Sequence, residues 1–182
     1  MALRDKIIEF TISQFEGGKV NDKADKGGIT NFGITKPFLA WYNGCKPENI
    51  NNDEINDLTK AEALTIYDWA WDQYAVDNLP DSVEHVFWDC CINHGRGNAV
   101  KIIQRALTLL GYNVGAIDGK MGMVTLNALY EADTKNSKSL MLSIVSARLS
   151  FYKLIVDRDP TQKKFIKGWT ARCNWFAEHS IC

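Results

Sequence analysis

The chain has 182 residues, of which 46% are hydrophobic and 24% are charged, and its formal net charge is −1. This composition is typical of a soluble globular protein, and the length suffices for one good-sized core or two small lobes. The near-zero charge argues against a nucleic-acid-binding protein, which would carry a basic patch. It also means that attraction to an anionic cell wall is not the main source of affinity.

The N-terminal sequence MALRDKIIEF contains acidic residues and lacks the apolar core of a secretory signal peptide. No run is predicted to reach transmembrane length. We therefore expect a protein that is made and folded in the cytoplasm, without a signal peptide and without a stable membrane anchor.

The five cysteines are an odd number without the spacing of a disulfide framework. They predict free, mostly buried thiols. His85 and His94 lie near the adjacent pair Cys90 and Cys91, but this spacing matches no standard zinc site. The sequence therefore predicts neither a metal site nor a cofactor.

Residues 3–15 are predicted to form a largely buried amphipathic helix, ended by Gly17 or Gly18 as a left-handed cap. Glu16 then falls in the last helical turn, near the negative end of the helix dipole and beside Phe15. Both the dipole and desolvation disfavour the ionised carboxylate, so we expect the pKa of Glu16 to be raised. A carboxyl group that stays protonated near neutral pH can act as a general acid.

The segment 16–35 is rich in glycine and carries a second carboxylate, Asp25. A tight turn at Asp25–Gly28 between two short extended arms predicts a hairpin that brings Asp25 and Thr30 back toward Glu16. Two carboxyl groups in different environments are the pair that glycoside hydrolysis requires. The alternative is that Glu16 is a solvated helix-end residue and Asp25 only forms the turn.

Four further elements are predicted between the hairpin and residue 95. A short helix with Pro37 in its first turn should begin after Thr35 and end at Asn43–Gly44. Residues 45–58 are expected to form a polar surface loop with about one helical turn. Thr59-x-x-Glu62 is a capping box that begins the next helix. The following helix should begin at Asp81 or Ser82 and end at Gly95.

The remaining chain is predicted to be helical, with breaks at glycine and proline. The expected helices cover residues 98–110, residues 123–132, a long stretch from Ser137 or Ser139 to Asp159, and a last stretch from Gln162 onward. Arg148 lies among the apolar positions of the long helix. A buried arginine requires a carboxylate partner, so we expect one to face it.

The glycine-rich run resembles glycoside hydrolase family 108, whose members are lysozyme-like N-acetylmuramidases found often among phage endolysins. The residues that carry this resemblance are Glu16-Gly17-Gly18, Asp25-x-Gly27-Gly28-x-Thr30 and Gly33-Ile34-Thr35. Phe87-x-Asp89, Asn93-x-Gly95 and Asp118-Gly119-x-x-Gly122-x-x-Thr125 are similar to the helical peptidoglycan-binding segment that usually follows. Gln162-Lys163-Lys164-Phe165-x-Lys167-Gly168-Trp169-x-x-Arg172 resembles the ending of the family. The resemblance covers nearly the whole chain.

The resemblance implies a mainly α, lysozyme-like fold of two helical lobes with one small β-hairpin at the active-site cleft. Residues 1–95 would form the catalytic lobe and residues 96–182 a helical lobe that resembles a peptidoglycan-binding segment. The sequence shows no internal repeat, low-complexity tract or Pro/Ser-rich linker. We therefore expect one continuous globular body.

The implied activity is hydrolysis of the β-1,4 bond between N-acetylmuramic acid and N-acetylglucosamine, for host cell lysis by an endolysin. Glu16 would be the general acid, Asp25 the base or electrostatic stabiliser, and Thr30 would help to hold the water. The candidate substrate-binding residues are Gly28, Asn31, Phe32, Asn93 and His94. A histidine at such a place is more often a partner of the helix C-terminus, so we do not expect His94 to be catalytic.

The partner implied is bacterial peptidoglycan, reached in the periplasm or cell wall through a holin or a similar route by a monomeric protein. Three alternatives remain. A lytic transglycosylase would use Glu16 alone on the same bond. A non-catalytic wall-binding or secretion-related protein would bind glycan without turnover. A metal-dependent peptidase would need a ligand pattern that this sequence lacks.

Overall fold

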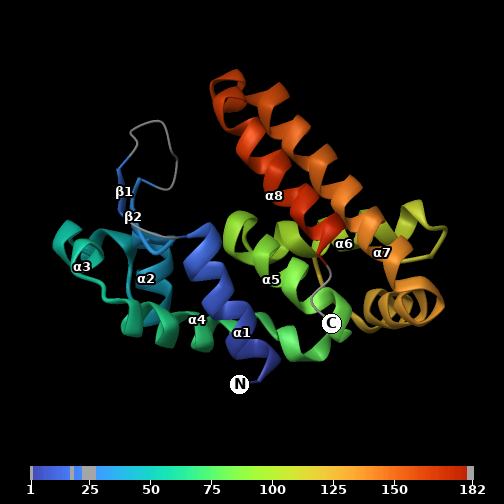
Figure 1. The fold of residues 1–182 in the computed structure, drawn as a ribbon, viewed down its shortest axis with the longest axis horizontal. Coiled ribbons are helices and arrows are strands. Elements are labelled where there is room, and N and C mark those ends of the chain that lie inside the picture. Colours follow the sequence, from blue (N-terminus) through green and yellow to red (C-terminus); the bar gives the residue numbers. More distant parts are fainter. Residues whose placement is uncertain (1, 17–18, 22–27, 180–182) are drawn as a thin grey trace. The chain divides into compact units, whose positions relative to one another are not determined.

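The computed structural model describes residues 2–16, 19–21 and 28–179. Two compact units make up the chain, Met1–Tyr74 and Ala75–Cys182. Within the described residues both units are mostly helical, and the first also contains a small sheet (Figure 1). The predicted mainly α class with one small β element is confirmed.

The first unit begins with α1, Leu3–Phe10, which continues directly into a π-helical turn, Thr11–Phe15. The apolar periodicity correctly predicted a helix with a buried face. It did not predict the widening of the last turn, because π geometry has no sequence signature of its own. π-helical turns are rare overall, but those that occur are often found at functional sites.

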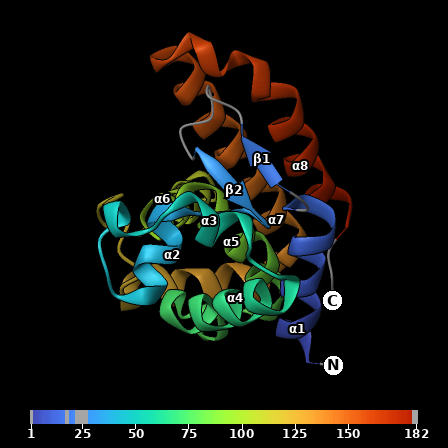
Figure 2. The same cartoon turned by 90° about the vertical axis from the view of Figure 1, so that its left-hand side faces the viewer.

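A three-stranded antiparallel sheet follows, with strands β1, Lys19–Asn21, β2, Ile29–Asn31, and β3, Ile34–Thr35. Figure 2 shows β1 and β2 side by side. The β1–β2 pair is the predicted hairpin. The third strand is a difference from the prediction, which expected one extended arm after the turn.

The rest of the first unit consists of helices whose ends follow from local capping. Helix α2, Lys36–Asn43, begins at Thr35, whose hydroxyl accepts a hydrogen bond from the Phe38 N–H at 3.2 Å, and ends at Gly44 in the left-handed region. Both helix ends were predicted. A 3₁₀ turn, Pro47–Asn49, a short helix α3, Asn52–Asn56, and a longer helix α4, Lys60–Tyr74, complete the unit.

The capping box that begins α4 is formed as predicted. The Thr59 N–H and hydroxyl both donate to the Glu62 carboxylate, at 2.8 and 2.7 Å, and the Glu62 N–H donates to the Thr59 hydroxyl at 3.3 Å. An aromatic cluster lies over α2 and α4, where Trp41 packs against Trp69 and Tyr74.

The second unit starts with a 3₁₀ turn, Val76–Asn78, and is built on α5, Asp81–His94. Every residue of α5 from Val83 to Cys91 is buried. Helix α6, Arg96–Leu109, packs against α5, and both end where the sequence places glycines, Gly95 and Gly111.

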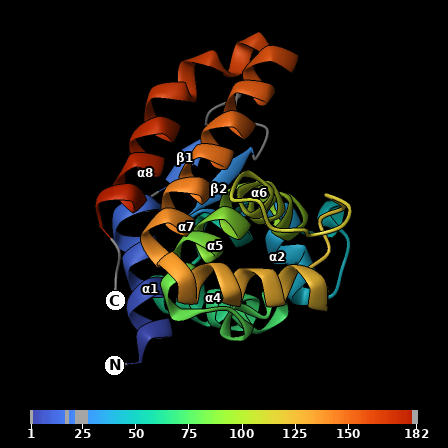
Figure 3. The ribbon, with the colours of Figure 1, turned by 90° about the vertical axis from the view of Figure 1, so that its right-hand side faces the viewer.

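Helix α7, Met123–Arg158, is interrupted at Asn136, which has non-helical backbone angles, so it comprises two helices, as predicted. The Asn136 side chain caps the second one by accepting a hydrogen bond from the Ser139 N–H at 2.9 Å. Figure 3 shows the change of direction and α8, Ile166–Glu178, beside the second half. A 3₁₀ segment, Pro160–Phe165, joins them.

By length and composition, α7 alone in the described part of the chain is apolar enough to cross a membrane. No such segment was expected from the sequence. Its apolar face packs against α6 and α8 within the second unit, and Leu140, Ile144 and Tyr152 are fully buried.

The loop before α7 carries the predicted Asp118-Gly119 motif and is organised by the buried Gln104. The Gln104 side chain donates to the Asp118 carboxylate at 3.0 Å and accepts from the Gly119 N–H at 2.9 Å. A Cβ at Gly119 would lie 2.7 Å from the Gly97 carbonyl oxygen, so the loop packs tightly on α6. The motif therefore has a structural role here.

Candidate active site

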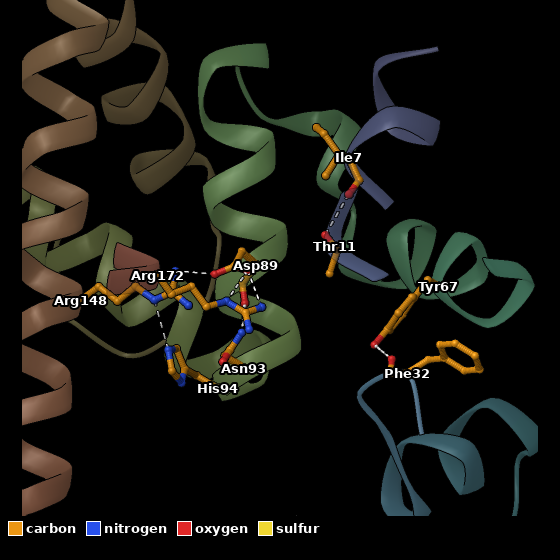
Figure 4. A network of polar contacts seen from close by, with 9 residues as sticks. All are labelled: Ile7, Thr11, Phe32, Tyr67, Asp89, Asn93, His94, Arg148 and Arg172. Carbon is orange, nitrogen blue, oxygen red and sulfur yellow. Dashed lines mark hydrogen bonds and ion pairs between the residues drawn. The ribbon is translucent and has the colours of Figure 1, made fainter. Parts of the chain in front are cut away.

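The carboxyl group of Glu16 is positioned by the end of the first helix. The Glu16 N–H donates to the Thr11 carbonyl at 3.0 Å, which closes the π-helical turn. Thr11 is fully buried, and its hydroxyl donates to the Ile7 carbonyl at 2.9 Å (Figure 4). Glu16 is half-buried, and the helix end that carries it is held in place by the buried Thr11.

The turn between β2 and β3 comes directly against this carboxyl group. Its central residues, Phe32 and Gly33, both have positive φ, as in the tight turns that join two-residue hairpins. A Cβ at Gly33 would lie 2.5 Å from Glu16 Oε2 and 2.9 Å from Glu16 Cβ. Only glycine leaves this space to the Glu16 side chain.

Tyr67 of α4 holds the same turn in place. Its hydroxyl donates to the Phe32 carbonyl at 2.6 Å (Figure 4), and the Tyr67 side chain is fully buried. The hydroxyl oxygen would lie 2.7 Å from a Cβ at Gly33, so it and Glu16 Oε2 approach the same point. A neutral donor and a carboxyl group therefore converge on one backbone turn.

Thr30 lies in the middle of the sheet, opposite Val20 on one side and Thr35 on the other, and its side chain is half-buried. Gly28, just before β2, is exposed and has a φ of +68°. The second predicted carboxylate, Asp25, lies outside the described residues.

Asn31 was a predicted substrate-binding residue, but its amide is used within the protein. The side chain is only 3% exposed. Its Nδ2 donates to the carbonyls of Asn56 and Leu58, at 3.2 and 3.1 Å. These bonds tie β2 to the connection between α3 and α4. Phe32, predicted for the same role, supplies the turn carbonyl that Tyr67 binds.

The remaining two candidates, Asn93 and His94, lie at the end of α5 in the second unit. Asn93 donates to the Asp89 carbonyl one turn earlier, at 3.1 Å. The His94 ring packs against Phe151 and Tyr152, and its Nε2 accepts from Arg148 Nε at 3.3 Å. Burial, with the charge of Arg148, lowers the pKa of His94 to about 3, so the ring is neutral.

Asp89 is the centre of a buried ion cluster formed with Arg148 and Arg172 (Figure 4). Asp89 Oδ2 lies 2.5 Å from an Arg148 terminal nitrogen, and Asp89 Oδ1 accepts from Arg172 Nε at 2.8 Å. Burial alone would raise the pKa of Asp89. The charges of Arg148 and Arg172 together have the larger effect and lower this pKa to about 2. The predicted carboxylate partner of Arg148 is confirmed.

Sequence reasoning missed two contributors to the site, Gly33 as a close-approach position and Tyr67 as the turn anchor. Gly33 is part of the glycine-rich motif. It lies between β2 and β3, and a glycine between two short extended segments is a signal for a tight turn. Tyr67 lies among the buried residues of α4. The hydroxyl contact joins residues 35 positions apart, and local pattern carries no sign of it.

Comparison with known proteins gives two family matches. The family described as glycosyl hydrolase 108 matches residues 10–95, and the family described as a predicted peptidoglycan domain matches residues 98–174. No curated protein matches the sequence. Among solved structures, the structure of Brucella abortus SagA is 30% identical with a TM-score of 0.79, over 98% of this chain and 93% of that one.

Proposed function

Because this chain belongs to the glycosyl hydrolase 108 family and continues into a peptidoglycan domain, we propose that it is a peptidoglycan muramidase with Glu16 as its general acid. The two family assignments support a glycoside hydrolase that acts on peptidoglycan. Within this class of enzyme we propose a lysozyme activity, which hydrolyses the β-1,4 bond between N-acetylmuramic acid and N-acetylglucosamine.

One observation carries the assignment of Glu16. Its carboxyl group occupies the space that a side chain at position 33 would take, against a turn fixed by Tyr67. A general acid must be held within hydrogen-bond reach of the leaving oxygen, so a fixed carboxyl group is the first requirement. The rigid turn supplies the positioning that such catalysis needs.

The other catalytic roles follow the family motif. We assign the second carboxylate to Asp25, which would stabilise positive charge on the sugar or activate water. Thr30, one residue before the buried Asn31, would help to hold that water. In this mechanism the acid protonates the glycosidic oxygen, the bond to the muramic acid carbon breaks, and water completes the hydrolysis.

The biological setting proposed is an endolysin of phage or prophage type, released to the wall by a holin and active as a monomer. The supporting argument is the resemblance of the catalytic motif to phage lysozymes. Peptidoglycan is the partner that the C-terminal family match supports.

The deciding experiment compares the parent with Glu16→Gln on purified peptidoglycan. Glutamine keeps the size and hydrogen-bonding reach of the side chain but has no transferable proton. General acid catalysis contributes about 10² to 10⁴ in rate, so the variant should be nearly inactive and normally folded. Retention of more than roughly a tenth of the parent rate would exclude Glu16 as the general acid.

Mass spectrometry of the released muropeptides identifies the reaction itself. A hydrolase leaves a reducing muramic acid that has gained water. A lytic transglycosylase leaves an anhydro product without that water, and a peptidase leaves the glycan intact. Detection of only anhydro products would replace hydrolysis with transglycosylation while keeping Glu16 as the acid.

A further inference from the structure

The first helix changes its hydrogen-bonding pattern just before the proposed catalytic carboxyl group. Leu3–Phe10 is α-helical, and the five residues Thr11–Phe15 form a π-helical turn. The Glu16 N–H closes this turn by donating to the Thr11 carbonyl at 3.0 Å. In an α-helix the same carbonyl would accept from Phe15, four residues on. The π-helical turn therefore contains one residue more than an α-helical turn.

The extra residue decides which side chain follows on the inner face of the helix. Ile7 and Thr11 are buried there, one α-helical turn apart (Figure 4). The residue whose N–H binds a given carbonyl lies one turn beyond it. Glu16 thus takes the place beyond Thr11 that Phe15 would take in an uninterrupted α-helix. In such a helix Glu16 would lie one position further on, about 100° around the axis from that place.

The contacts of the neighbouring side chains agree with this arrangement. Glu16 is half-buried, and a Cβ at Gly33 would lie 2.5 Å from its Oε2 atom. The Phe15 ring packs edge-on against Phe10, with the ring centroids 5.4 Å apart. Ser13, in the middle of the turn, is exposed. The turn therefore directs its polar residue to solvent and its aromatic ring along the helix, while Glu16 faces the Gly33 turn.

Thr11 is the residue at which the pattern changes. Its N–H is shared between the carbonyls of Ile7 and Ile8, and its hydroxyl also donates to the Ile7 carbonyl, at 2.9 Å. A threonine hydroxyl that binds the carbonyl four residues earlier competes with the backbone and often bends a helix. Thr11 is fully buried, so this arrangement is held within the core. One residue thus ends the α-helical pattern with its two donors and begins the π-helical turn with its carbonyl.

We propose that the π-helical turn aims the catalytic carboxyl group and that Thr11 is its positioning residue. The inference rests on the proposed function, because it takes Glu16 to be the general acid. A general acid must lie within hydrogen-bond reach of the leaving oxygen. The extra residue of the turn supplies this placement from the side of the helix, as the Gly33 turn does from the side of the sheet.

A deletion and an insertion of one residue test the proposal. Deletion of Ser13 leaves Glu16 four residues after Thr11, so the same hydrogen bond closes an ordinary α-helical turn and Glu16 keeps its place. This variant should keep most of the parent turnover on peptidoglycan. Insertion of an alanine after Ser13 moves Glu16 beyond that bond and should lower turnover by about 10²-fold.

The two changes would act alike if the turn had no special length. In a plain α-helix a deletion and an insertion each rotate Glu16 by about 100°, so both variants would be inactive. Any result other than an active deletion variant and an impaired insertion variant would overturn the proposal. A deletion variant that does not fold, as judged by circular dichroism, has the same consequence.

Substitutions of Thr11 test its role as the positioning residue. Thr11→Val keeps the shape of the side chain but removes the hydroxyl, and it should lower kcat by up to about 10²-fold with little change in KM. Thr11→Ser restores the hydroxyl and should recover most of the lost kcat. The control is Thr65→Val on α4, because the Thr65 hydroxyl makes the same kind of bond, to the Ala61 carbonyl at 3.1 Å. A parent-like kcat for Thr11→Val, or no recovery with Thr11→Ser, would remove Thr11 from positioning.

Urea denaturation separates this proposal from the proposed function. The Ser13 deletion replaces a π-helical turn with regular α-helical hydrogen bonds, so its urea midpoint should equal or exceed that of the parent. The insertion should lower the midpoint, and a lower midpoint for the deletion would contradict the proposal. If the parent does not hydrolyse peptidoglycan, the muramidase proposal fails while the midpoints still test the length of the turn. If Glu16→Gln is inactive but the insertion variant matches the parent, Glu16 keeps its role and the turn does not position it.

Discussion

The two units use polar groups in opposite ways. In the first unit the half-buried Glu16 is positioned by neutral backbone geometry, the Gly33 turn and the Tyr67 hydroxyl. In the second unit charged groups hold the fold together, because Asp89 and Arg148 are fully buried and paired. Polar residues of a family motif can therefore be architectural. Here the motif residues Asp89 and Arg172 pair with each other inside the second unit.

The largest expected effect comes from breaking the buried ion cluster. Asp89→Asn leaves Arg148 buried without a countercharge, and this should lower the free energy of unfolding by about 3–5 kcal/mol. Urea denaturation measures the change. Arg172→Gln should cost less, since Asp89 keeps Arg148, and Asp157→Asn, an exposed acid on α7, should change stability by less than about 0.5 kcal/mol. Equal losses for Asp89→Asn and Asp157→Asn would refute a structural role for the cluster.

The matching test in the first unit is Gly33→Ala. The added Cβ must displace the Glu16 side chain, and a displacement of about 1 Å can reduce turnover about 10²-fold. The control is Gly44→Ala, which has a similar positive φ of +65° but nothing within 4 Å of the added Cβ. Both variants should lose about 1–2 kcal/mol of stability through backbone strain. Only Gly33→Ala should lose activity on peptidoglycan, and similar activities for the two would separate Gly33 from the site.

Tyr67→Phe sharpens the comparison by removing one neutral hydrogen bond. The Phe32 carbonyl loses its donor, so we expect a loss of about 1 kcal/mol in stability and a lower kcat with little change in KM. Tyr130→Phe is the control, because the Tyr130 hydroxyl contacts a carbonyl at an exposed position, at 3.3 Å. A change in KM alone would place Tyr67 in substrate binding instead of in positioning.

The last expected effect depends on pH and concerns Glu84 on α5. Burial, with the charges of Asp81 and Asp77, raises the pKa of Glu84 from 4.5 to about 7. Between these two values the folded protein keeps a proton that the unfolded chain has lost, so stability falls as pH rises through this window.

Glu84→Gln should flatten this fall and be more stable than the parent by up to about 3 kcal/mol at pH 8, with little difference at pH 4. Urea denaturation at pH 4, 6 and 8 measures it. Glu131→Gln, at an exposed position of α7, should keep the slope of the parent. A parent whose stability is flat from pH 5 to pH 7 would contradict the raised pKa.

Local patterns predicted those parts of the fold whose causes are local. Thr35, the Thr59–Glu62 capping box and the break before Ser139 act within one helical turn, and each was predicted from the sequence. Arg148 could be identified as needing a carboxylate because it interrupts an apolar stripe. Its partner Asp89 lies 59 positions earlier, and the choice among the acidic residues is made by tertiary packing.

The candidate site was predicted only in part for the same reason. Glu16 and Thr30 followed from motif and spacing. The burial of Asn31 could not be predicted from the sequence. The Asn31 amide is held by the carbonyls of Asn56 and Leu58, and these reach β2 only when α3 and α4 have formed. His94 looks like a ligand for sugar in sequence, but its ring nitrogen is occupied by Arg148.

Helix α5 has a consequence for recombination and protein engineering. The glycosyl hydrolase match ends at residue 95, whereas α5 belongs by packing to the unit that begins at Ala75. A chimera joined between residues 95 and 98 would separate Asp89 from both arginines and graft a foreign surface onto nine consecutive buried residues. A junction at Tyr74–Ala75 keeps these partners together, so crossovers that yield folded hybrids should concentrate there.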